Sequence, residues 1–341
     1  MAVQSQRVQT QSPEPGKTAV AMTEEFATPG AERTPKKGRR PAQGRSLGAR
    51  SAPYLLLLPA VAATVFLLGW PLLKIAVVSF QNLNKRQFIQ HLTEWNGFAN
   101  YTEQLGSSEF WAITLRTVVF TAVNVVLIMV FGSLIGLLLD RLGKRMRLAL
   151  SVALLLAWAM PIVAATTVYT WLFDQHYGVV NWFLDKLGWH SMADFSWTSG
   201  EYSTFFVVIL LIVWQSIPFV AFNTYAGLTT IPKELYEAAR MDGAGSFKVF
   251  GSVIFPILKP FFLATTFLEV IWVFKSFTQV YLINKGGPDG LTRTLPVHAF
   301  LEGFGAQRFG VGSAIAVLTI LMLSLLMAYY FRIILKQEDE L

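Results

Sequence analysis

The 341-residue sequence is 53% hydrophobic and 14% charged, with a mean hydropathy of +0.47. Soluble domains carry roughly 25% charged residues. With 27 Phe and 10 Trp, this chain has too few polar side chains to cover a globule in water. The composition therefore argues against a disordered chain and against an ordinary soluble enzyme, and it favours a protein that lies in a bilayer.

The chain has no cysteine, which excludes disulfides, cysteine-based zinc sites and thiol nucleophiles. Its four histidines form neither an HExxH motif nor a pair at helical spacing. They are His91, His176, His190 and His298. We therefore expect no catalytic residue, no metal site and no cofactor in this chain.

Residues 1–50 hold nine Lys or Arg among Pro, Gly, Ser, Thr and Gln, and few large apolar residues. Such a segment cannot bury enough apolar surface to offset its chain entropy, so we expect a disordered basic tail. The first apolar stretch begins at Tyr54 and has the full length of a span, which argues against a cleavable signal peptide.

Residues 51–341 are predicted to form one all-α integral membrane domain. A helix needs about 20 apolar residues to cross a bilayer. Five stretches of that length contain no charged residue, and a sixth is interrupted only by Glu269 and Lys275. These stretches predict six transmembrane helices at about 54–80, 114–139, 148–173, 203–229, 260–283 and 309–332.

The distribution of basic residues predicts the orientation of these helices. If the N-terminus is cytoplasmic, 19 of the 28 Lys and Arg fall on the cytoplasmic side, six fall outside and three lie in or beside spans. Because cytoplasmic loops are enriched in Lys and Arg, we expect both termini in the cytoplasm. The net charge of +7 then follows from membrane topology rather than from nucleic-acid binding.

The loop at about 230–259 after the fourth span has a pattern of its own. Pro232 suits the first turn of a helix, and the stretch from Lys233 to Met241 predicts a short helix with Leu235, Ala238 and Ala239 on its apolar side. Gly243 and Gly245 then end it.

A second short helix is predicted after these glycines, with Ser246 as its cap and an apolar face of Phe247, Phe250 and Ile254. Two short helices with small and aromatic residues suit docking into a groove on another protein. The residues alone fit equally well an amphipathic loop that lies on lipid headgroups.

The sequence EAARMDGAGSFKVFGSVIFPILKP closely resembles the EAA loop of ABC importer permeases. The matching positions are Glu237, Ala238, Ala239, Asp242, Gly243, Ala244, Phe250, Ile254, Pro256 and Pro260. WNGFANYTEQLGSSEFW and the run from Pro161 to Asn181 resemble segments of carbohydrate-uptake permeases. YLINKGGP is similar to an element of the maltose-permease-like or glycerol-phosphate-permease-like half of their heterodimers, although Ile283, Asn284 and Lys285 depart from its usual pattern.

This resemblance implies the transmembrane domain of a type I ABC importer in a bacterial plasma membrane. The implied partners are a second permease of related fold, two cytoplasmic ATPase subunits that bind ATP and Mg, and an extracellular solute-binding lipoprotein. In that family the loop is a coupling helix that enters a cleft of the ATPase. Glu237 would contact the ATPase, and Ala238 and Ala239 would permit close approach. Asp242 and Gly243 would shape the turn, and Phe250 would anchor the loop. Ala244 and Pro256 complete the implied coupling set.

Polar and aromatic residues on the fifth predicted span suggest a path for substrate. At about 100° per residue, Glu269, Trp272, Lys275, Ser276 and Gln279 share an arc of about 120° on a continuous helix. Sugars bind through hydroxyl hydrogen bonds and through stacking on aromatic rings. The alternative is that Glu269 and Lys275 satisfy each other or their neighbours, or that Lys275 reaches outward to the interface.

Further candidates on the fourth span are Trp214, Gln215, Asn223 and Tyr225. Pro218 is expected to open that helix locally and to free a backbone carbonyl. Arg116 and Asn124 on the second span are weaker candidates.

Three functions compete for this sequence. The first is the permease of an ATP-driven carbohydrate importer, or of an importer for another solute such as glycerol-3-phosphate. The absence of GxxxxGK[ST] means that ATP hydrolysis is expected in a separate subunit. A membrane-embedded enzyme would need converging acids or histidines, and a channel or secondary transporter would need an internal repeat; neither feature is apparent. The sequence does not name the sugar, and an amino sugar or an oligosaccharide is a guess.

Overall fold

The computed structural model describes residues 47–338, with side chains described for 56–336. The predicted tail at 1–50 therefore lies almost wholly outside the described residues. The chain divides into two units, Met1–Pro59 and Ala60–Leu341. The described part of the first unit begins helix α1 (Leu47–Thr64), and the second unit carries everything discussed below.

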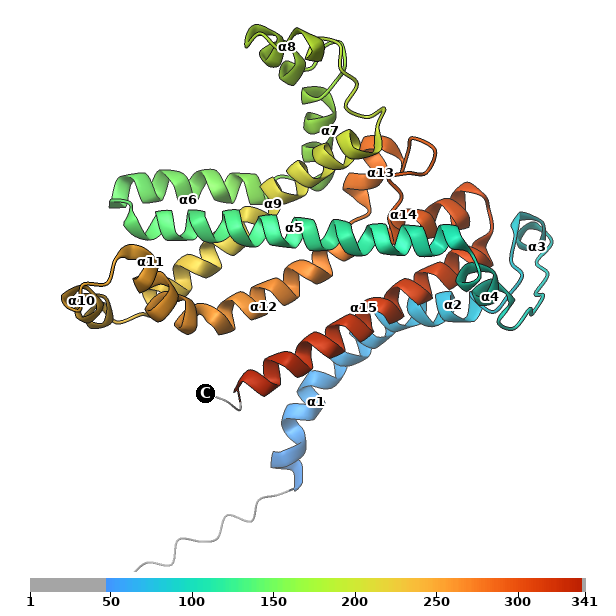
Figure 1. Ribbon diagram of the computed structural model, residues 1–341. Helices are drawn as coiled ribbons and strands as arrows, with labels where there is room; N and C mark the ends of the chain where they lie inside the picture. Colours follow the sequence, from blue (N-terminus) through green and yellow to red (C-terminus); the bar gives the residue numbers. More distant parts are fainter. Residues whose placement is uncertain (1–46, 339–341) are drawn as a thin grey trace, which may run out of the picture. The chain divides into compact units, whose positions relative to one another are not determined.

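Within residues 47–338 the chain is helical and has no β-strand (Figure 1). The longer helices are α2 (Trp70–Val78), α5 (Ser108–Arg141), α6 (Lys144–Ala159), α7 (Ile162–Leu172), α9 (Glu201–Thr229), α12 (Phe255–Phe274) and α15 (Phe309–Glu338). The shorter helices are α3 (Lys85–Ile89), α4 (Ala99–Leu105), α8 (Val179–Lys186), α10 (Lys233–Met241), α11 (Ser246–Val249), α13 (Thr278–Asn284) and α14 (Leu295–Phe300). Three π-helical turns, η1 (Val65–Gly69), η3 (Phe250–Ile254) and η4 (Leu301–Gly305), and a 3₁₀ turn, η2 (His190–Met192), complete the list.

Five helical stretches are long and apolar enough to cross a membrane. They are Leu56–Val78, Ser108–Arg141, Glu201–Thr229, Ser246–Asn284 and Phe309–Lys336. A sixth span is present if α6 and α7 are taken together, although they meet at an angle of 98°. The sequence predicted one continuous helix at 148–173, so the structure corrects this prediction.

The break between α6 and α7 has a local cause. Pro161 has no N–H, and the residue before a proline is pushed out of the helical region. Met160 accordingly has ψ 127°. The Met160 carbonyl has no place in a helix ladder, and the Gln215 side chain of α9 donates to it at 3.2 Å. By contrast, Pro218 lies buried inside an unbroken α9, so the predicted opening of that helix is wrong.

Helices α5 and α9 form the most extensive pairing in the second unit, and α12 packs against both. Gly132 and Gly136, one turn apart on α5, allow this close approach. A Cβ at Gly132 would lie 2.5 Å from the Cβ of Val220, and one at Gly136 would lie 2.6 Å from the Cβ of Thr224. Small residues at this spacing let helix backbones approach within a bilayer.

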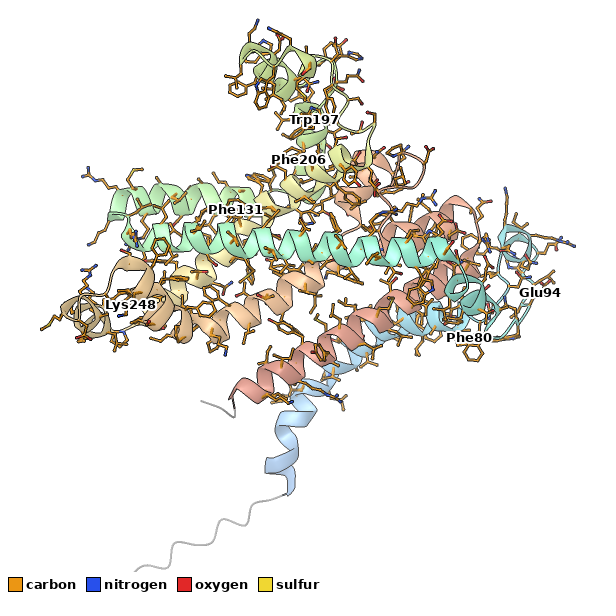
Figure 2. All side chains as sticks on the ribbon, viewed as in Figure 1. Phe80, Glu94, Phe131, Trp197, Phe206 and Lys248 are labelled. Atoms are coloured by element: carbon orange, nitrogen blue, oxygen red, sulfur yellow. The ribbon has the colours of Figure 1, made fainter. Side chains whose placement is uncertain are left out.

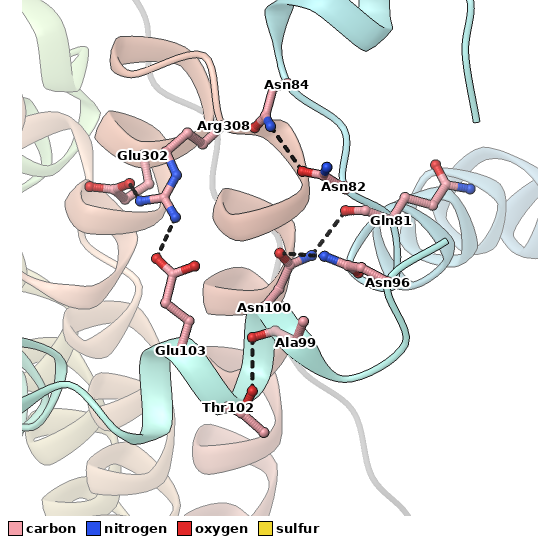
Figure 3. Close-up of polar contacts among 10 residues, drawn as sticks. All are labelled: Gln81, Asn82, Asn84, Asn96, Ala99, Asn100, Thr102, Glu103, Glu302 and Arg308. Atoms are coloured by element: carbon pink, nitrogen blue, oxygen red, sulfur yellow. Dashed lines mark hydrogen bonds and ion pairs between the residues drawn. The ribbon is translucent and has the colours of Figure 1, made fainter. Parts of the chain in front are cut away.

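One end of α2 is fastened to α4 and to the start of α15 by hydrogen bonds (Figure 3). The buried Asn100 side chain donates to the carbonyl oxygens of Ser79 and Gln81 at 2.8 and 3.0 Å. A Cβ at Gly310 would lie 2.1 Å from the Gln81 oxygen, so only glycine allows α15 to begin there.

The Arg308 guanidinium adds ion pairs to this region. It pairs with Glu103 of α4 and, at 3.2 Å, with Glu302 of η4 (Figure 3). These contacts leave the arginine charge matched by two carboxylates at the surface of the unit.

The crossing of α5 and α9 gives a testable consequence. We expect Gly136→Ala to lower the melting temperature of the detergent-solubilised protein, because its methyl group would also meet the backbone oxygen of Ala221 at 2.8 Å. Overpacking of this kind costs about 1–3 kcal/mol. Gly69→Ala is the control, since Gly69 is also helical and its Cβ would make only an ordinary contact at 3.8 Å. Equal melting temperatures for the two variants would contradict the close crossing.

Candidate functional site

The loop after α9 folds as two short helices and a tight turn between them. Helix α10 has the predicted bounds, Lys233–Met241. Asp242 ends it, and Gly243 follows with φ +74°, a conformation that strongly favours glycine. The Ala244 N–H donates to the Ala239 carbonyl at 3.0 Å and fixes the turn. We call residues 230–259 the α10 loop.

The second short helix differs from its prediction. Gly245, not Ser246, occupies the cap position of α11, and Ser246 makes no capping hydrogen bond. Phe247 lies 95% exposed, although it was predicted on the apolar face. The chain passes after four residues into the wider π-helical turn η3, so the buried side instead carries Val249, Phe250 and Ile254.

The α10 loop has a buried side and an exposed side. Tyr236 and Phe250 pack on a cluster formed by Leu228, Ile254 and Leu258, which belongs to the ends of α9 and α12 and to η3. Phe250 therefore contacts the helical bundle, as an anchor would. The exposed side carries Glu237, Ala238, Asp242 and Pro256, while Ala239 and Ala244 are half-buried.

Two exposed apolar residues were missed as candidates for docking. Met241 and Phe247 flank the Gly243 turn and are 88% and 95% exposed. Lys248, next to Phe247, is also exposed on this loop (Figure 2). The sequence alone did not mark them, since the exposure of a residue beside a glycine turn depends on how the whole loop packs.

A cavity of about 660 Å³ lies between the α10 loop and the turn that joins α5 to α6. Its charged lining residues are Asp140, Arg141, Arg147, Lys233, Glu237 and Arg240. Arg147 donates to the carbonyl oxygens of Leu139, Asp140 and Leu142, which end α5, and its guanidinium lies 5.2 Å from the ring centroid of Tyr225. Tyr225 thus supports this turn and does not line the substrate-path candidate described next.

A second cavity, of about 540 Å³, lies at the break between α6 and α7, and we call it the bend cavity. Its polar and aromatic lining comes from four helices and the segment between α12 and α13. The lining residues are Trp158, Met160, Pro161, Ile162, Ile212, Gln215, Ser216, Trp272, Val273, Lys275, Ser276, Phe277, Thr278 and Gln279.

Four of the five predicted residues of the fifth span meet in the bend cavity, but not because they form a helical stripe. Helix α12 ends at Phe274, and α13 begins only at Thr278. The continuous helix assumed at 260–283 is therefore wrong. Trp272 comes from the end of α12, Lys275 and Ser276 from the interruption, and Gln279 from the first turn of α13.

Glu269 does not line the bend cavity. Its side chain is fully buried, and neither carboxylate oxygen has a hydrogen-bond partner among the described residues. Lys275 is exposed, and the structure shows no ion pair between the two within the described part of the chain.

Of the path candidates on the fourth and second spans, Gln215 lines the bend cavity, and the others lie elsewhere. Trp214 packs beside Tyr169, with ring centroids 5.8 Å apart, and Asn223 donates to the Phe219 carbonyl of its own helix. Arg116 pairs with Glu201 at 3.6 Å, and Asn124 donates to its own helix. Sequence reasoning missed Ser216 and the α6–α7 break as parts of the cavity, because the break itself was not foreseen.

Among the described residues, no group of three or more His, Cys, Asp or Glu is arranged to hold a metal ion. The α10 loop and the two cavities hold most of the residues that the sequence singled out.

Comparisons with known proteins identify the family. A family model described as "Binding-protein-dependent transport system inner membrane component" matches residues 128–337. The diacetylchitobiose uptake system permease protein DasB of Streptomyces coelicolor is 61% identical over 98% of this chain and 99% of its own length. The trehalose/maltose transport system permease protein MalF of Thermococcus litoralis is 31% identical over 81% of this chain and 91% of its own.

A solved structure has the same fold. A chain from a bacterial ABC transporter involved in the import of the acidic polysaccharide alginate matches with a TM-score of 0.73, at 17% identity, over 85% of this chain and 97% of its own. The predicted fold class, an all-α transmembrane domain of an ABC importer, is thereby confirmed. This chain belongs to the family of binding-protein-dependent transport system inner membrane components.

Proposed function

We propose that this chain is the permease subunit of an ATP-driven importer that carries N-acetylated amino-sugar oligosaccharides, of the diacetylchitobiose class, into the cytoplasm. The observation that carries the proposal is the bend cavity, where aromatic rings and amide, hydroxyl and ammonium groups face one space. Similarity along nearly the whole chain to a permease named for diacetylchitobiose supports this choice of sugar.

The bend cavity suits such a sugar in three ways. Trp158 and Trp272 offer flat surfaces for pyranose ring faces and acetyl methyl groups. The side-chain amide of Gln279 can donate to and accept from hydroxyls, and the Lys275 ammonium can donate to an acetamido oxygen. The cavity has one cation and no arginine among its described lining residues, which disfavours the phosphate of glycerol-3-phosphate.

The exposed side of the α10 loop is proposed to dock on a cytoplasmic ATPase. Glu237 would make the polar contact, Ala238 and Ala239 the close approach, and Asp242, Gly243 and Ala244 the turn. Phe250 would hold the loop to the bundle, Pro256 would complete the exposed surface, and Met241 and Phe247 would fill apolar hollows of the partner. The exposure of Glu237, Met241 and Phe247 supports this role.

The remaining parts of the assembly belong to the same proposal. A second permease of related fold would complete the path, two ATPase subunits would bind ATP and Mg, and an extracellular solute-binding lipoprotein would deliver the sugar. Both termini would be cytoplasmic, an orientation supported by the concentration of Lys and Arg in the tail and in the loops at 140–147 and 233–259.

The sugar is tested by uptake of radiolabelled N,N′-diacetylchitobiose into proteoliposomes that contain the complete complex and ATP. We expect uptake that excess unlabelled diacetylchitobiose abolishes and that glycerol-3-phosphate leaves unchanged. Trp272→Ala should reduce uptake at least tenfold, because it removes one wall of the bend cavity. Trp70→Ala, at a 55% exposed position outside the cavity, should leave uptake unchanged. Competition by glycerol-3-phosphate instead would overturn the sugar assignment.

Docking of the α10 loop is tested by Glu237→Lys. We expect loss of uptake with the permease still present in the membrane, because the reversed charge would face the ATPase. The matched control is Asp194→Lys, a reversal at an exposed carboxylate in the segment between α8 and α9. Normal transport by Glu237→Lys would refute the assigned role.

The newly recognised residue Phe247 gives a separate test of the same surface. Phe247→Ser should reduce co-purification of the ATPase by several-fold, since a large apolar contact is lost, while the melting temperature of the permease alone stays the same. Tyr202→Ser, at an 87% exposed position in the first turn of α9, is the control. Unchanged co-purification would mean that Phe247 faces lipid rather than the partner.

A further inference from the structure

Helix α7 forms one wall of a groove that the bend cavity does not include. The groove has a volume of about 460 Å³, and its lining residues are Val163, Thr166, Thr167, Thr170, Trp171, Asp174 and Leu282. Three of these residues are threonines of α7. We call it the threonine groove.

The threonine hydroxyls all donate to their own helix. Thr166, Thr167 and Thr170 each donate to the carbonyl four residues earlier, at 2.7, 2.9 and 2.9 Å. A hydroxyl has one proton to donate and two lone pairs that accept. With the proton engaged in this way, the exposed Thr167 and Thr170 oxygens offer acceptors to a molecule in the groove, whereas Thr166 is buried.

Asp174 adds a further acceptor at the end of the groove. Its Oδ1 accepts from the backbone N–H groups of Tyr177 and His176, both at 2.9 Å. These bonds, that of Tyr177 foremost, hold the pKa of the Asp174 carboxyl below its usual value, so it stays ionised at neutral pH. Trp171, 56% exposed, supplies an aromatic surface beside it.

The threonine groove and the bend cavity lie on the same two helices. On α7, Ile162 lines the bend cavity and Val163 lines the groove. On α13, Gln279 lines the bend cavity, and Leu282, about one turn further along, lines the groove. Helices α7 and α13 pack against each other, so the two spaces lie beside the same helix pair.

We propose that the threonine groove is a second sugar-binding subsite, which holds one sugar unit by its hydroxyl groups next to the bend cavity. This proposal rests on the proposed function. Sugar hydroxyls are hydrogen-bond donors, and the groove presents acceptors with an aromatic surface beside them. An acceptor-only surface would gain nothing from lipid chains, which have no donor.

The first test replaces two hydroxyls by methyl groups of nearly the same size. In the complete complex, the double variant Thr167→Val/Thr170→Val should raise the KM for diacetylchitobiose uptake about tenfold, as expected for two lost hydrogen bonds, with a smaller change in kcat. The control is Thr319→Val, because Thr319 of α15 also donates to the carbonyl four residues earlier, at 2.7 Å, and lines neither space. An unchanged KM in the double variant overturns the subsite.

The second test uses the absence of cysteine from the chain. Thr170→Cys in the complex should react with a polar, membrane-impermeant methanethiosulfonate, and saturating diacetylchitobiose should slow that reaction. Reaction that sugar does not slow, or reaction only with a lipid-soluble maleimide, overturns the proposal.

If the wild-type complex fails to transport diacetylchitobiose, the proposed function itself fails. If the wild-type complex transports the sugar and neither variant has an effect, only the subsite is overturned.

Discussion

The ring of Pro161, which pushes Met160 out of the helical conformation, is the constraint on which the candidate site depends. It ends α6 at Ala159 and turns the chain by 98° into α7. The extended backbone of Met160 takes its carbonyl out of the helix ladder, and that carbonyl needs another donor. Gln215 supplies it across 55 positions of sequence. The same bond therefore stabilises the bend and places a side-chain amide in the wall of the bend cavity.

The break matters because α5, α9 and α12 pack closely against one another. The glycines of α5 bring its backbone against α9, and α12 covers both. The bend cavity forms where α6 ends and where α12 is interrupted at Lys275, so two breaks in two helices meet at one place. Irregular backbone at membrane depth is tolerated where it lines such a cavity.

A feature of the fold or of the site could be predicted from the sequence where it depends on neighbouring residues, and not where it depends on contacts between distant ones. The bounds of α10 were predictable, since Pro232 and Gly243 act on their immediate neighbours. The effects of Pro218 and Pro161 on their helices were not predictable. Pro218 lies buried in α9, in the long packing against α5, and the helix stays intact. At Pro161 a distant glutamine favours the broken form. The membership of the bend cavity depends on these long-range contacts, and so does the burial of Glu269.

The α10 loop and the bend cavity are joined by two continuous helices. Helix α9 carries Gln215 and Ser216 in the cavity wall and Leu228 in the apolar cluster under the loop. Helix α12 carries Leu258 in that cluster and Trp272 in the wall. A Cβ at Gly227 would lie 2.5 Å from Leu258, so the two helices touch where the loop leaves them. Fourteen residues of helix, from Leu258 to Trp272, extend about 21 Å. Because α9 and α12 each run unbroken between the two places, the loop is connected by helix to the wall of the bend cavity from both of its ends.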